Sequence, residues 1–338
     1  MAVIKGNAYG HGMLACASVL ADADAFAVAR LSEARALREA GIDKPLVLLG
    51  GLFSKADLDL AIELDASPCM HSFEQLDWLE DSGKSGLSVW VKVDTGMNRL
   101  GFRLDDAAAA ISRAQACDSV ADVKVMTHFA NADDPGDKTT RIQIEKFKRV
   151  IEGFDGDVSI ANSAGLFGWA DELRNFEDVV ETGRLWIRPG IALYGVSPII
   201  GRSAADLGLR AAMQFESRLI LVKPVLAGEG VGYGGRWRSA RDSTLGIVAA
   251  GYGDGFTRFL PAGTPVIVND RRVPVVGVIS MDLTVVDLGQ GATDQAGDTV
   301  ILWGDGLPVE AVAEYAGTVP YQLVTGVTHR EEPIYEGH

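Results

Sequence analysis

The first 207 residues repeat one pattern, in which a short apolar, often β-branched run is followed by a longer stretch of helical spacing. Eight such runs occur, at Ala2–Lys5, Ala25–Arg30, Pro45–Gly50, Ser67–Ser72, Leu87–Asp94, Val123–Phe129, Val158–Ser163 and Leu185–Ile191. Between them, leucine, alanine and isoleucine recur every three or four residues among charges, as in Leu31–Ala40, Ser54–Glu63, Asp105–Ala116 and Lys138–Glu152. Eight strands that are each followed by a helix can close into a (β/α)8 barrel, and we expect that α/β fold here.

The pattern changes after the stretch Gly201–Gly208. Strand-like runs then follow one another without helices, at Arg218–Pro224, Thr244–Ala250, Pro265–Val268, Val273–Ser280, Leu283–Leu288 and Asp298–Trp303. Asn269-Asp270, between two valine-rich runs, predicts a hairpin turn. We therefore expect a barrel domain over residues 1–207 and a mostly β domain over residues 208–338.

Composition narrows the range of functions. The chain of 338 residues is 47% hydrophobic and 23% charged, as is usual for globular proteins, and no apolar run approaches the roughly 20 residues of a membrane span. The start has no basic segment that leads into a signal-peptide core, so the cytoplasm is the expected location. A net charge of −15 argues against binding to nucleic acid or to anionic membranes and favours small-molecule chemistry.

Neither a disulfide framework nor a metal site is expected. Cys16, Cys69 and Cys117 are scattered and form no Cys-x-x-Cys spacing. His128 and Asp133 follow one predicted strand, but they lack a third ligand. We therefore interpret His128 as a hydrogen-bonding residue behind a site rather than as a metal ligand.

Lys5 is the first candidate for chemistry. It ends a short apolar strand, where desolvation lowers the pKa of an amine and makes it a Schiff-base nucleophile. The loop Gly6–Gly12 that follows is too rich in glycine to predict a helix, and its glycines let the backbone approach a ligand closely around Tyr9. An isolated lysine near a chain start is more often simply solvated, but this loop favours a functional role.

Other polar residues also end predicted strands. Arg99, in a loop between Gly96 and Gly101, has the geometry to hold a carboxylate, although a surface ion pair is the simpler explanation. Ser163 precedes an alanine-rich helix start. The free N–H groups of such a start can bind phosphate, but the serine can also be an ordinary N-cap. Arg188, followed by Gly190, is either structural or part of a phosphate site.

The β domain contributes two glycine loops that each carry one tyrosine, Tyr233 and Tyr252. Most loops of this kind are exposed turns. The tripeptide Ser280-Met281-Asp282 closes a strand, and its N–H groups could contact a carboxylate, although an acid at a strand end more often forms a turn.

Taken in order, these segments resemble the alanine racemases. The matching segments are Val3-Ile4-Lys5-Gly6-Asn7-Ala8-Tyr9-Gly10-His11-Gly12, Lys92-Val93-Asp94-Thr95-Gly96-Met97-Asn98-Arg99-Leu100-Gly101, His128-Phe129-Ala130, Ala161-Asn162-Ser163-Ala164, Arg188-Pro189-Gly190-Ile191, Val231-Gly232-Tyr233-Gly234, Gly251-Tyr252-Gly253-Asp254-Gly255 and Ser280-Met281-Asp282. Each segment is weak evidence alone, but the ordered set is specific.

The resemblance implies a pyridoxal-phosphate enzyme that acts as a head-to-tail homodimer and interconverts L- and D-alanine, which supplies D-alanine for peptidoglycan. It implies that Lys5 carries the cofactor as a Schiff base and that Tyr9, Ser163, Gly190 and Ile191 hold the phosphate. Arg188 would face the pyridine nitrogen, while Arg99 and the Met281 N–H would meet the substrate carboxylate.

The resemblance also assigns a second base. Racemisation removes the Cα proton from one face and returns a proton to the other, so two groups must flank that carbon. By the resemblance these are Lys5 and Tyr233 of the partner subunit. Tyr252 would line the entrance, Lys92, carbamylated in some members, would orient Arg99, and His128 and Asp282 would support the site.

The chain departs from the family pattern at three places. Members normally carry a further strand and helix ahead of the lysine strand, so the resemblance implies that this chain lacks them. Some relatives have a tyrosine that touches the phosphate near the C-terminus, where this chain has Thr328-His329-Arg330. A histidine of relatives, before the Ala-Asn-Ser stretch, corresponds to Ser159 here.

Other pyridoxal-phosphate barrels fit less well. Zinc-dependent D-serine dehydratases and the decarboxylases of this fold need a late cysteine, and no cysteine follows Cys117. A single-domain pyridoxal-phosphate-binding protein would end after the barrel. A non-catalytic cofactor carrier stays open as an alternative, and so does serine in place of alanine as the substrate.

Overall fold

The computed structural model describes residues 1–177, 180 and 183–336, so the last two residues of the expected β domain, 337–338, lie outside the described part. The chain divides into two compact units. The first comprises Met1–Ala8, Met13–Leu193 and Ser197–Leu207, and the second comprises Tyr9–Gly12, Tyr194–Val196 and Gly208–His338. Among the described residues, no helix combines the length and the apolar character that crossing a membrane requires.

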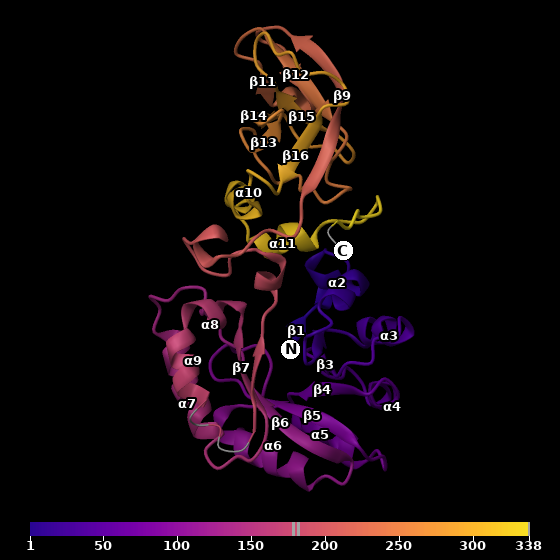
Figure 1. The fold of residues 1–338 in the computed structure, drawn as a ribbon, viewed down its shortest axis with the longest axis vertical. Coiled ribbons are helices and arrows are strands. Elements are labelled where there is room, and N and C mark those ends of the chain that lie inside the picture. The colour runs from indigo at the N-terminus through magenta and orange to yellow at the C-terminus, as the bar shows by residue number, and fades with distance from the viewer. Residues whose placement is uncertain (178–179, 181–182, 337–338) are drawn as a thin grey trace. The chain divides into compact units, whose positions relative to one another are not determined.

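The first unit is built on an eight-stranded parallel sheet whose strands follow one another in chain order (Figure 1). The strands are β1 (Ala2–Val3), β2 (Phe26–Val28), β3 (Leu46–Leu48), β4 (Ala66–Met70), β5 (Leu87–Lys92), β6 (Val120–Met126), β7 (Val158–Asn162) and β8 (Leu185–Arg188). The Val3 N–H donates to the Pro189 carbonyl at 2.9 Å, which joins the first strand to the end of the last. The sheet thus has the barrel form predicted from the alternating pattern.

Helices follow the strands and bury one face each, as their spacing of apolar residues predicts. They are α2 (Met13–Val19), α3 (Leu31–Glu39), α4 (Ala56–Glu63), α5 (Phe73–Glu80), α6 (Leu104–Ala116), α7 (Thr139–Val150), α8 (Ser163–Gly168) and α9 (Ala170–Glu177), while the segment α1 (Lys5–Tyr9) is a left-handed turn. In α6, for example, Ala107, Ala110, Ile111 and Ala114 are buried at intervals of three and four residues. The strands inside are buried on both sides, as in β2, β3 and most of β5.

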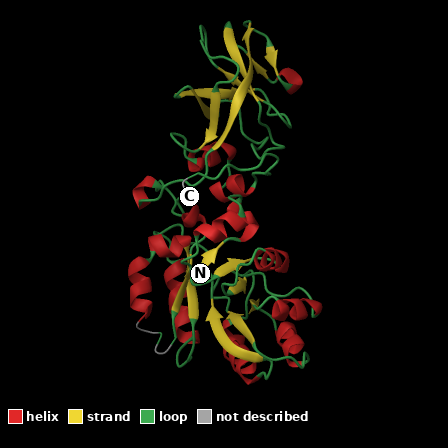
Figure 2. Ribbon diagram, turned by 45° about the vertical axis from the view of Figure 1, so that its right-hand side comes forward, coloured by secondary structure: helices red, strands yellow, loops and turns green. Residues whose placement is uncertain are grey.

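The second unit is mostly β, as Figure 2 makes clear from its predominance of strands. Its strands are β9 (Phe215–Val225), β10 (Gly230–Val231), β11 (Trp237–Arg238), β12 (Ser243–Val248), β13 (Pro265–Val268), β14 (Arg271–Val276), β15 (Thr284–Asp287) and β16 (Thr299–Trp303). Six of them close into an antiparallel barrel in the order β12-β15-β14-β13-β16-β9, while β10 and β11 form a separate ribbon. Two helices follow, α10 (Val309–Ala316) and α11 (Pro320–Thr325).

The expected (β/α)8 barrel followed by a mostly β domain is confirmed, and each predicted strand is present. Asn269 and Asp270 form the predicted turn between β13 and β14, with φ of 46° and 59°. Three features were not predicted, and the first is the short ribbon of β10 and β11. The segment after Lys5 is a left-handed turn rather than an open loop, and the second unit ends in two helices.

Candidate active site

Lys5 directly follows β1, at the carboxyl end of the parallel sheet, where ligands bind in folds of this kind. The N–H of the preceding Ile4 donates to the Ala27 carbonyl, which continues the pairing of β1 with β2 up to the lysine. Lys5 is half-buried, and burial together with the Arg99 charge lowers the pKa of its amine. A lowered pKa increases the share of the neutral, nucleophilic form of the amine.

A left-handed turn carries the chain away from Lys5. Gly6, Asn7, Ala8 and Tyr9 all have φ between 53° and 62°, which costs residues other than glycine roughly 1–2 kcal/mol each. The Ala8 N–H donates to the Ile4 carbonyl at 2.8 Å, and the Asn7 side-chain oxygen accepts from the Met13 N–H at 2.9 Å. The glycine-rich loop expected here is therefore a left-handed turn, held in part by these local bonds.

Tyr9 ends this turn, within the second unit. Its ring lies 5.2 Å from that of Tyr194 and 6.0 Å from that of Tyr321, centroid to centroid. Burial raises the pKa of Tyr9 to about 12. The hydroxyl is therefore un-ionised at neutral pH and can donate a hydrogen bond to an anion.

Arg188 ends β8 and is buried, with all of its recorded hydrogen-bond partners uncharged. Its Nη1 donates to Ser159 Oγ at 2.5 Å, and its Nη2 donates to the carbonyls of Thr127 at 2.6 Å and Ile160 at 3.4 Å. Burial lowers the pKa of Arg188 to about 10, so the guanidinium is still charged at neutral pH. Burying an unpaired charge is costly, so this group calls for an anion or an electron-rich acceptor.

Lys92 and His128 flank Arg188 at the ends of β5 and β6. Lys92 is buried, and burial lowers the pKa of its amine to about 8. His128 Nδ1 lies 3.3 Å from Arg188 Nη2, and burial, followed by the Arg188 charge, lowers the pKa of the imidazole well below its usual value. A neutral His128 can accept this bond, which agrees with the interpretation of His128 as a hydrogen-bonding residue.

Ser163 lies where β7 passes into α8, and its hydroxyl faces the end of β8. Its Oγ accepts from the N–H groups of Gly190 at 2.8 Å and Ala192 at 3.3 Å, so Ser163, Gly190 and the adjoining Ile191 lie together. The residue that caps α8 is Asn162, whose side chain accepts from the Gly165 N–H, so the alternative of Ser163 as the N-cap was wrong. A hydroxyl beside backbone N–H groups is a donor set suited to phosphate.

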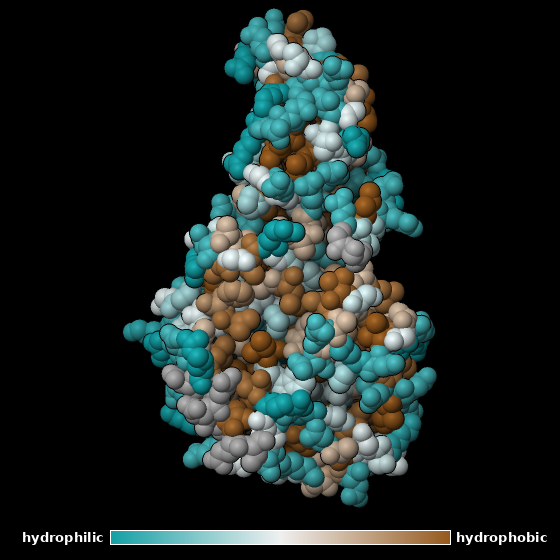
Figure 3. All heavy atoms as spheres, in the orientation of Figure 1, coloured by the Kyte–Doolittle hydropathy of each residue, from teal (hydrophilic) through white to brown (hydrophobic). Residues whose placement is uncertain are grey.

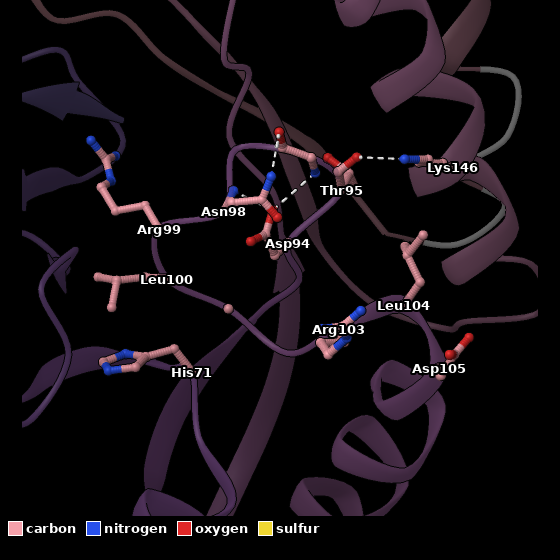
Figure 4. A pocket seen from close by; sticks show the side chains of 12 residues that line it. His71, Asp94, Thr95, Asn98, Arg99, Leu100, Arg103, Leu104, Asp105 and Lys146 are labelled. Atoms are coloured by element: carbon pink, nitrogen blue, oxygen red, sulfur yellow. Dashed lines mark hydrogen bonds between the residues drawn. The ribbon is translucent and has the colours of Figure 1, made fainter.

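Arg99 lies on an exposed loop that Asp94 organises. One Asp94 oxygen accepts from the N–H groups of Gly96, Met97 and Asn98, at 2.9, 2.9 and 3.1 Å. Arg99, Lys146 and His71 line an open hollow of about 680 Å³ around this loop. Figure 4 shows the Arg99 side chain extending away from Asp94, which leaves its guanidinium available to a ligand carboxylate.

The candidate residues that the β domain contributes are exposed. Tyr233 is 66% exposed, Met281 53% and Tyr252 38%. Arg330 joins two of the segments concerned, because its Nη1 lies 3.1 Å from Asp254 Oδ1 and 2.9 Å from Asp282 Oδ1. These side chains can therefore meet a surface or ligand outside their own unit.

Two residues that contact the site were missed from the sequence. Gln143 on α7 donates to Thr95 Oγ1 and to the His128 carbonyl, at 3.1 and 3.0 Å, and its buried position among Thr140, Ile144 and Phe147 was the available signal. Glu33 on α3 accepts from the Gly6 N–H at 2.6 Å. Its place three residues after Arg30, at a helix start, is the spacing of a capping box.

The first unit thus brings Lys5, Lys92, His128, Ser163, Arg188 and Gly190 to the same ends of neighbouring strands. The positive groups outnumber the acids beside them, which suits an anionic ligand that also offers a carbonyl to the Lys5 amine. Within the described ranges, no group of three or more histidine, cysteine, aspartate and glutamate side chains could hold a metal ion.

Comparison with family models gives a match over most of the chain. The model of the alanine racemase N-terminal domain matches residues 1–198, and that of the alanine racemase C-terminal domain matches residues 212–335. The alanine racemase of Aeromonas hydrophila is 48% identical over 332 residues, which cover 98% of this chain and 90% of the relative. That of Shewanella sediminis is 49% identical with the same coverage.

Solved structures agree. The biosynthetic alanine racemase from Pseudomonas aeruginosa superposes with a TM-score of 0.90 at 38% identity, covering 98% of this chain and 90% of the other. The alanine racemase from Bartonella henselae, solved with covalently bound pyridoxal phosphate, gives a TM-score of 0.87 at 31% identity, covering 99% of this chain and 92% of the other.

Proposed function

This chain belongs to the alanine racemase family of pyridoxal-phosphate-dependent isomerases, and from that premise we propose that it interconverts L- and D-alanine at a cofactor held by Lys5. The observation that carries the proposal is the surroundings of Lys5. Its amine has a lowered pKa and stands at strand ends that also carry Lys92 and Arg188, two buried cations. An aldehyde would react with the amine, and a phosphate on the same molecule would be attracted to the positive charge.

The residues present fit pyridoxal phosphate. Ser163 and the Gly190 and Ile191 backbone would hold the phosphate, with Tyr9 as a further donor whose raised pKa keeps its hydroxyl protonated. Arg188 would face the pyridine nitrogen, with His128 beside it. When bound, pyridoxal phosphate supplies an electron-withdrawing ring that acidifies the Cα–H of an amino acid joined to it.

Two residues would exchange the Cα proton. Lys5, with the lowered pKa of its amine, would act on one face, and Tyr233 of the partner subunit would act on the other. The supporting observation for Tyr233 is its 66% exposure on a glycine loop, which leaves the phenol free to enter a neighbouring site. Each active site would then be shared between two subunits.

The substrate carboxylate would be held by Arg99 and by the Met281 N–H of the partner subunit. Lys92 would orient Arg99, and its pKa of about 8 raises the share of neutral amine, which is the form that reacts with carbon dioxide to give a carbamate. Asp282 would fix the Met281 segment through its ion pair with Arg330, and Tyr252 would line the entrance. This set positions alanine without taking part in proton transfer.

Arg188 would also protect the reaction from a side path. The Arg188 guanidinium is protonated at neutral pH even with its pKa lowered to about 10. It would therefore donate to the pyridine nitrogen and leave that nitrogen unable to accept a further proton. The ring would then draw less electron density from Cα. Fewer protons would be added to the cofactor carbon in place of Cα. Transamination would be suppressed relative to racemisation.

A homodimer follows from the shared site. The β unit exposes large apolar side chains, including Phe259 at 83% and Ile220 at 52%, and Figure 3 shows several groups of apolar side chains exposed among hydrophilic ones on the barrel unit. Exposed apolar groups of this kind favour association.

We further infer a cytoplasmic enzyme whose D-alanine enters peptidoglycan.

The test is direct. Purified protein with pyridoxal phosphate is incubated separately with L-alanine and L-serine, and the products are resolved by chiral chromatography. We expect D-alanine to form faster than D-serine, and Lys5→Ala to abolish both the bound-cofactor absorbance and the activity. Lys84→Ala, on an exposed residue, is the control. Borohydride reduction that places the pyridoxyl label anywhere other than Lys5 would refute the proposal.

A further inference from the structure

Glu33 contacts the peptide group of the proposed cofactor lysine. The Gly6 N–H belongs to the peptide bond that joins Lys5 to Gly6, and it donates to Glu33 Oε1 at 2.6 Å. Hydrogen bonds to a charged carboxylate are stronger than those between neutral groups. Gly6 itself is exposed, so this bond rather than burial restrains the backbone directly after Lys5.

The same carboxylate also holds the next strand end. Glu33 Oε2 accepts from the N–H groups of Ala29 at 2.7 Å and Arg30 at 3.0 Å, just after β2. One side chain therefore ties the end of β1 to the end of β2. The tie sits at Gly6, the first of four left-handed residues, where the chain turns away from Lys5 at a cost in backbone energy.

Charge adds to this geometry. The ionisable groups that act electrostatically on Lys5, or on which Lys5 acts, are Glu33 from α3, Lys92 from β5, Arg99 from the loop after it, His128 after β6 and Arg188 from β8. Glu33 is the acid in this set. It opposes the lowering of the Lys5 pKa by burial and by the arginines.

We propose that Glu33 is a positioning residue for Lys5, which fixes the lysine backbone against the left-handed turn and balances the positive charge around its amine. The lysine amine must reach the cofactor and also exchange a proton with Cα, and a misplacement of about 1 Å costs roughly 100-fold in rate. The proposal rests on the proposed function for its catalytic consequence. Its structural part, the clamp itself, can be tested without catalysis.

A matched control exists within the same barrel. Asp57 Oδ2 accepts from the N–H groups of Phe53 and Ser54, at 2.8 and 3.0 Å, at the start of α4. This clamp follows β3, which is separated from β1 by β2 in the sheet order. Asp57→Ala and Asp57→Asn therefore remove a comparable clamp away from Lys5.

The first measurement is hydrogen–deuterium exchange of the cofactor-free protein. In Glu33→Ala we expect the amides of residues 5–9 and 29–30 to exchange about tenfold faster than in the unmodified protein, because a charge-assisted bond is lost. Asp57→Ala should accelerate exchange only around residues 53–54. Unchanged exchange at Gly6 in Glu33→Ala would overturn the clamp.

The second measurement titrates Lys5 in cofactor-free protein by competitive acylation, read by peptide mapping. Glu33→Gln keeps one acceptor oxygen and removes the charge, so we expect the Lys5 midpoint to shift to lower pH. Asp57→Asn should leave it unchanged. A midpoint equal in Glu33→Gln and Asp57→Asn would overturn the charge-balancing role.

The third measurement is racemisation by the cofactor-loaded variants. We expect Glu33→Ala to lower kcat for alanine about tenfold or more with little change in KM, and Asp57→Ala to change kcat less than threefold. Equal kcat in the two variants would overturn the catalytic part of the proposal. Unmodified protein that does not racemise alanine would refute the proposed function, while the exchange and acylation results would still decide the clamp.

Discussion

Arg188 and Ser159 form a short, buried hydrogen bond, in which Arg188 Nη1 donates to Ser159 Oγ at 2.5 Å. Ser159 in turn donates to the Trp186 carbonyl at 2.7 Å, so its hydroxyl links the guanidinium to the strand that carries it. The acceptor is neutral, and the positive charge of Arg188 is left for a ligand.

Replacing Ser159 by alanine should destabilise the protein. Arg188 Nη1 then loses its acceptor inside the barrel, and an unsatisfied buried donor costs about 1–3 kcal/mol. Urea unfolding of the cofactor-free protein measures the effect, with Ser32→Ala, on an exposed residue of α3, as the control. Equal unfolding midpoints for the two variants would contradict this account of the bond.

Replacing Arg188 by glutamate should redirect the chemistry. A glutamate can share a proton with the pyridine nitrogen where a guanidinium cannot, so more protons should reach the cofactor carbon. We expect racemisation to fall about 100-fold and pyruvate formed per racemisation to rise. Pyruvate is assayed beside chiral chromatography. Arg184→Glu, at an exposed arginine just before β8, is the control. An unchanged ratio of the two products counts against the role of Arg188.

Lys92 should make stability depend on pH. Its pKa is about 8 in the folded protein and 10.5 as the ordinary value, so the unfolded chain binds more protons between these values. The free energy of unfolding from this residue should therefore rise with pH from about 8 to 10.5, by on the order of 2 kcal/mol. Urea unfolding of cofactor-free protein and Lys92→Met across this range gives the difference. In Lys84→Met the free energy of unfolding should still rise with pH as in the unmodified protein, whereas Lys92→Met should lose this rise.

Mixed dimers test the shared site. If each site takes Lys5 from one subunit and Tyr233 from the other, a hybrid of Lys5→Ala and Tyr233→Phe subunits has one intact site and one doubly altered site. Random pairing of equal amounts should restore about a quarter of the unmodified activity. Refolding the two inactive variants together and assaying racemisation measures this. Recovery no greater than the sum of the separate variants would show that the residues do not come from different subunits.

Tyr233→Phe alone should separate the two proton transfers. Lys5 remains able to act on one face of Cα, so one enantiomer of alanine should exchange its Cα proton with deuterated solvent without inversion, which proton NMR follows. The other enantiomer should exchange at least about 100-fold more slowly. Tyr315→Phe, at a tyrosine of α10 that is 49% exposed, is the control. Equal exchange of both enantiomers would exclude Tyr233 as the second base.

Much of the fold could be predicted from sequence because its signals are local. Buried parallel strands are short continuous apolar runs, and helices show their period, so β1 to β8 and β12 to β16 could be located within a few residues. The candidate residues Lys5, Arg99, Ser163 and Arg188 could be singled out because each ends or follows a strand, where barrel sites lie.

The parts that were missed depend on contacts between distant residues. Propensity argues against three left-handed residues at Asn7, Ala8 and Tyr9, and the turn is held instead by groups such as Glu33, which is 27 residues from Gly6. Gln143 was read as one more residue of an amphipathic helix, although its amide joins the loops after β5 and β6. Such roles appear only when the strands are brought together.

The connection between β10 and β11 carries Tyr233 at the tip of their ribbon. Val231 and Trp237, at its base, pack into an apolar cluster with Val225, Leu245 and Val276, while Gly232, Gly234 and Gly235 at its tip all have positive φ. Two residue pairs do not make a ribbon rigid by themselves. The phenol therefore lies on a glycine-containing loop that is packed only at its base, so the surface that meets the loop would also set the position of the Tyr233 oxygen.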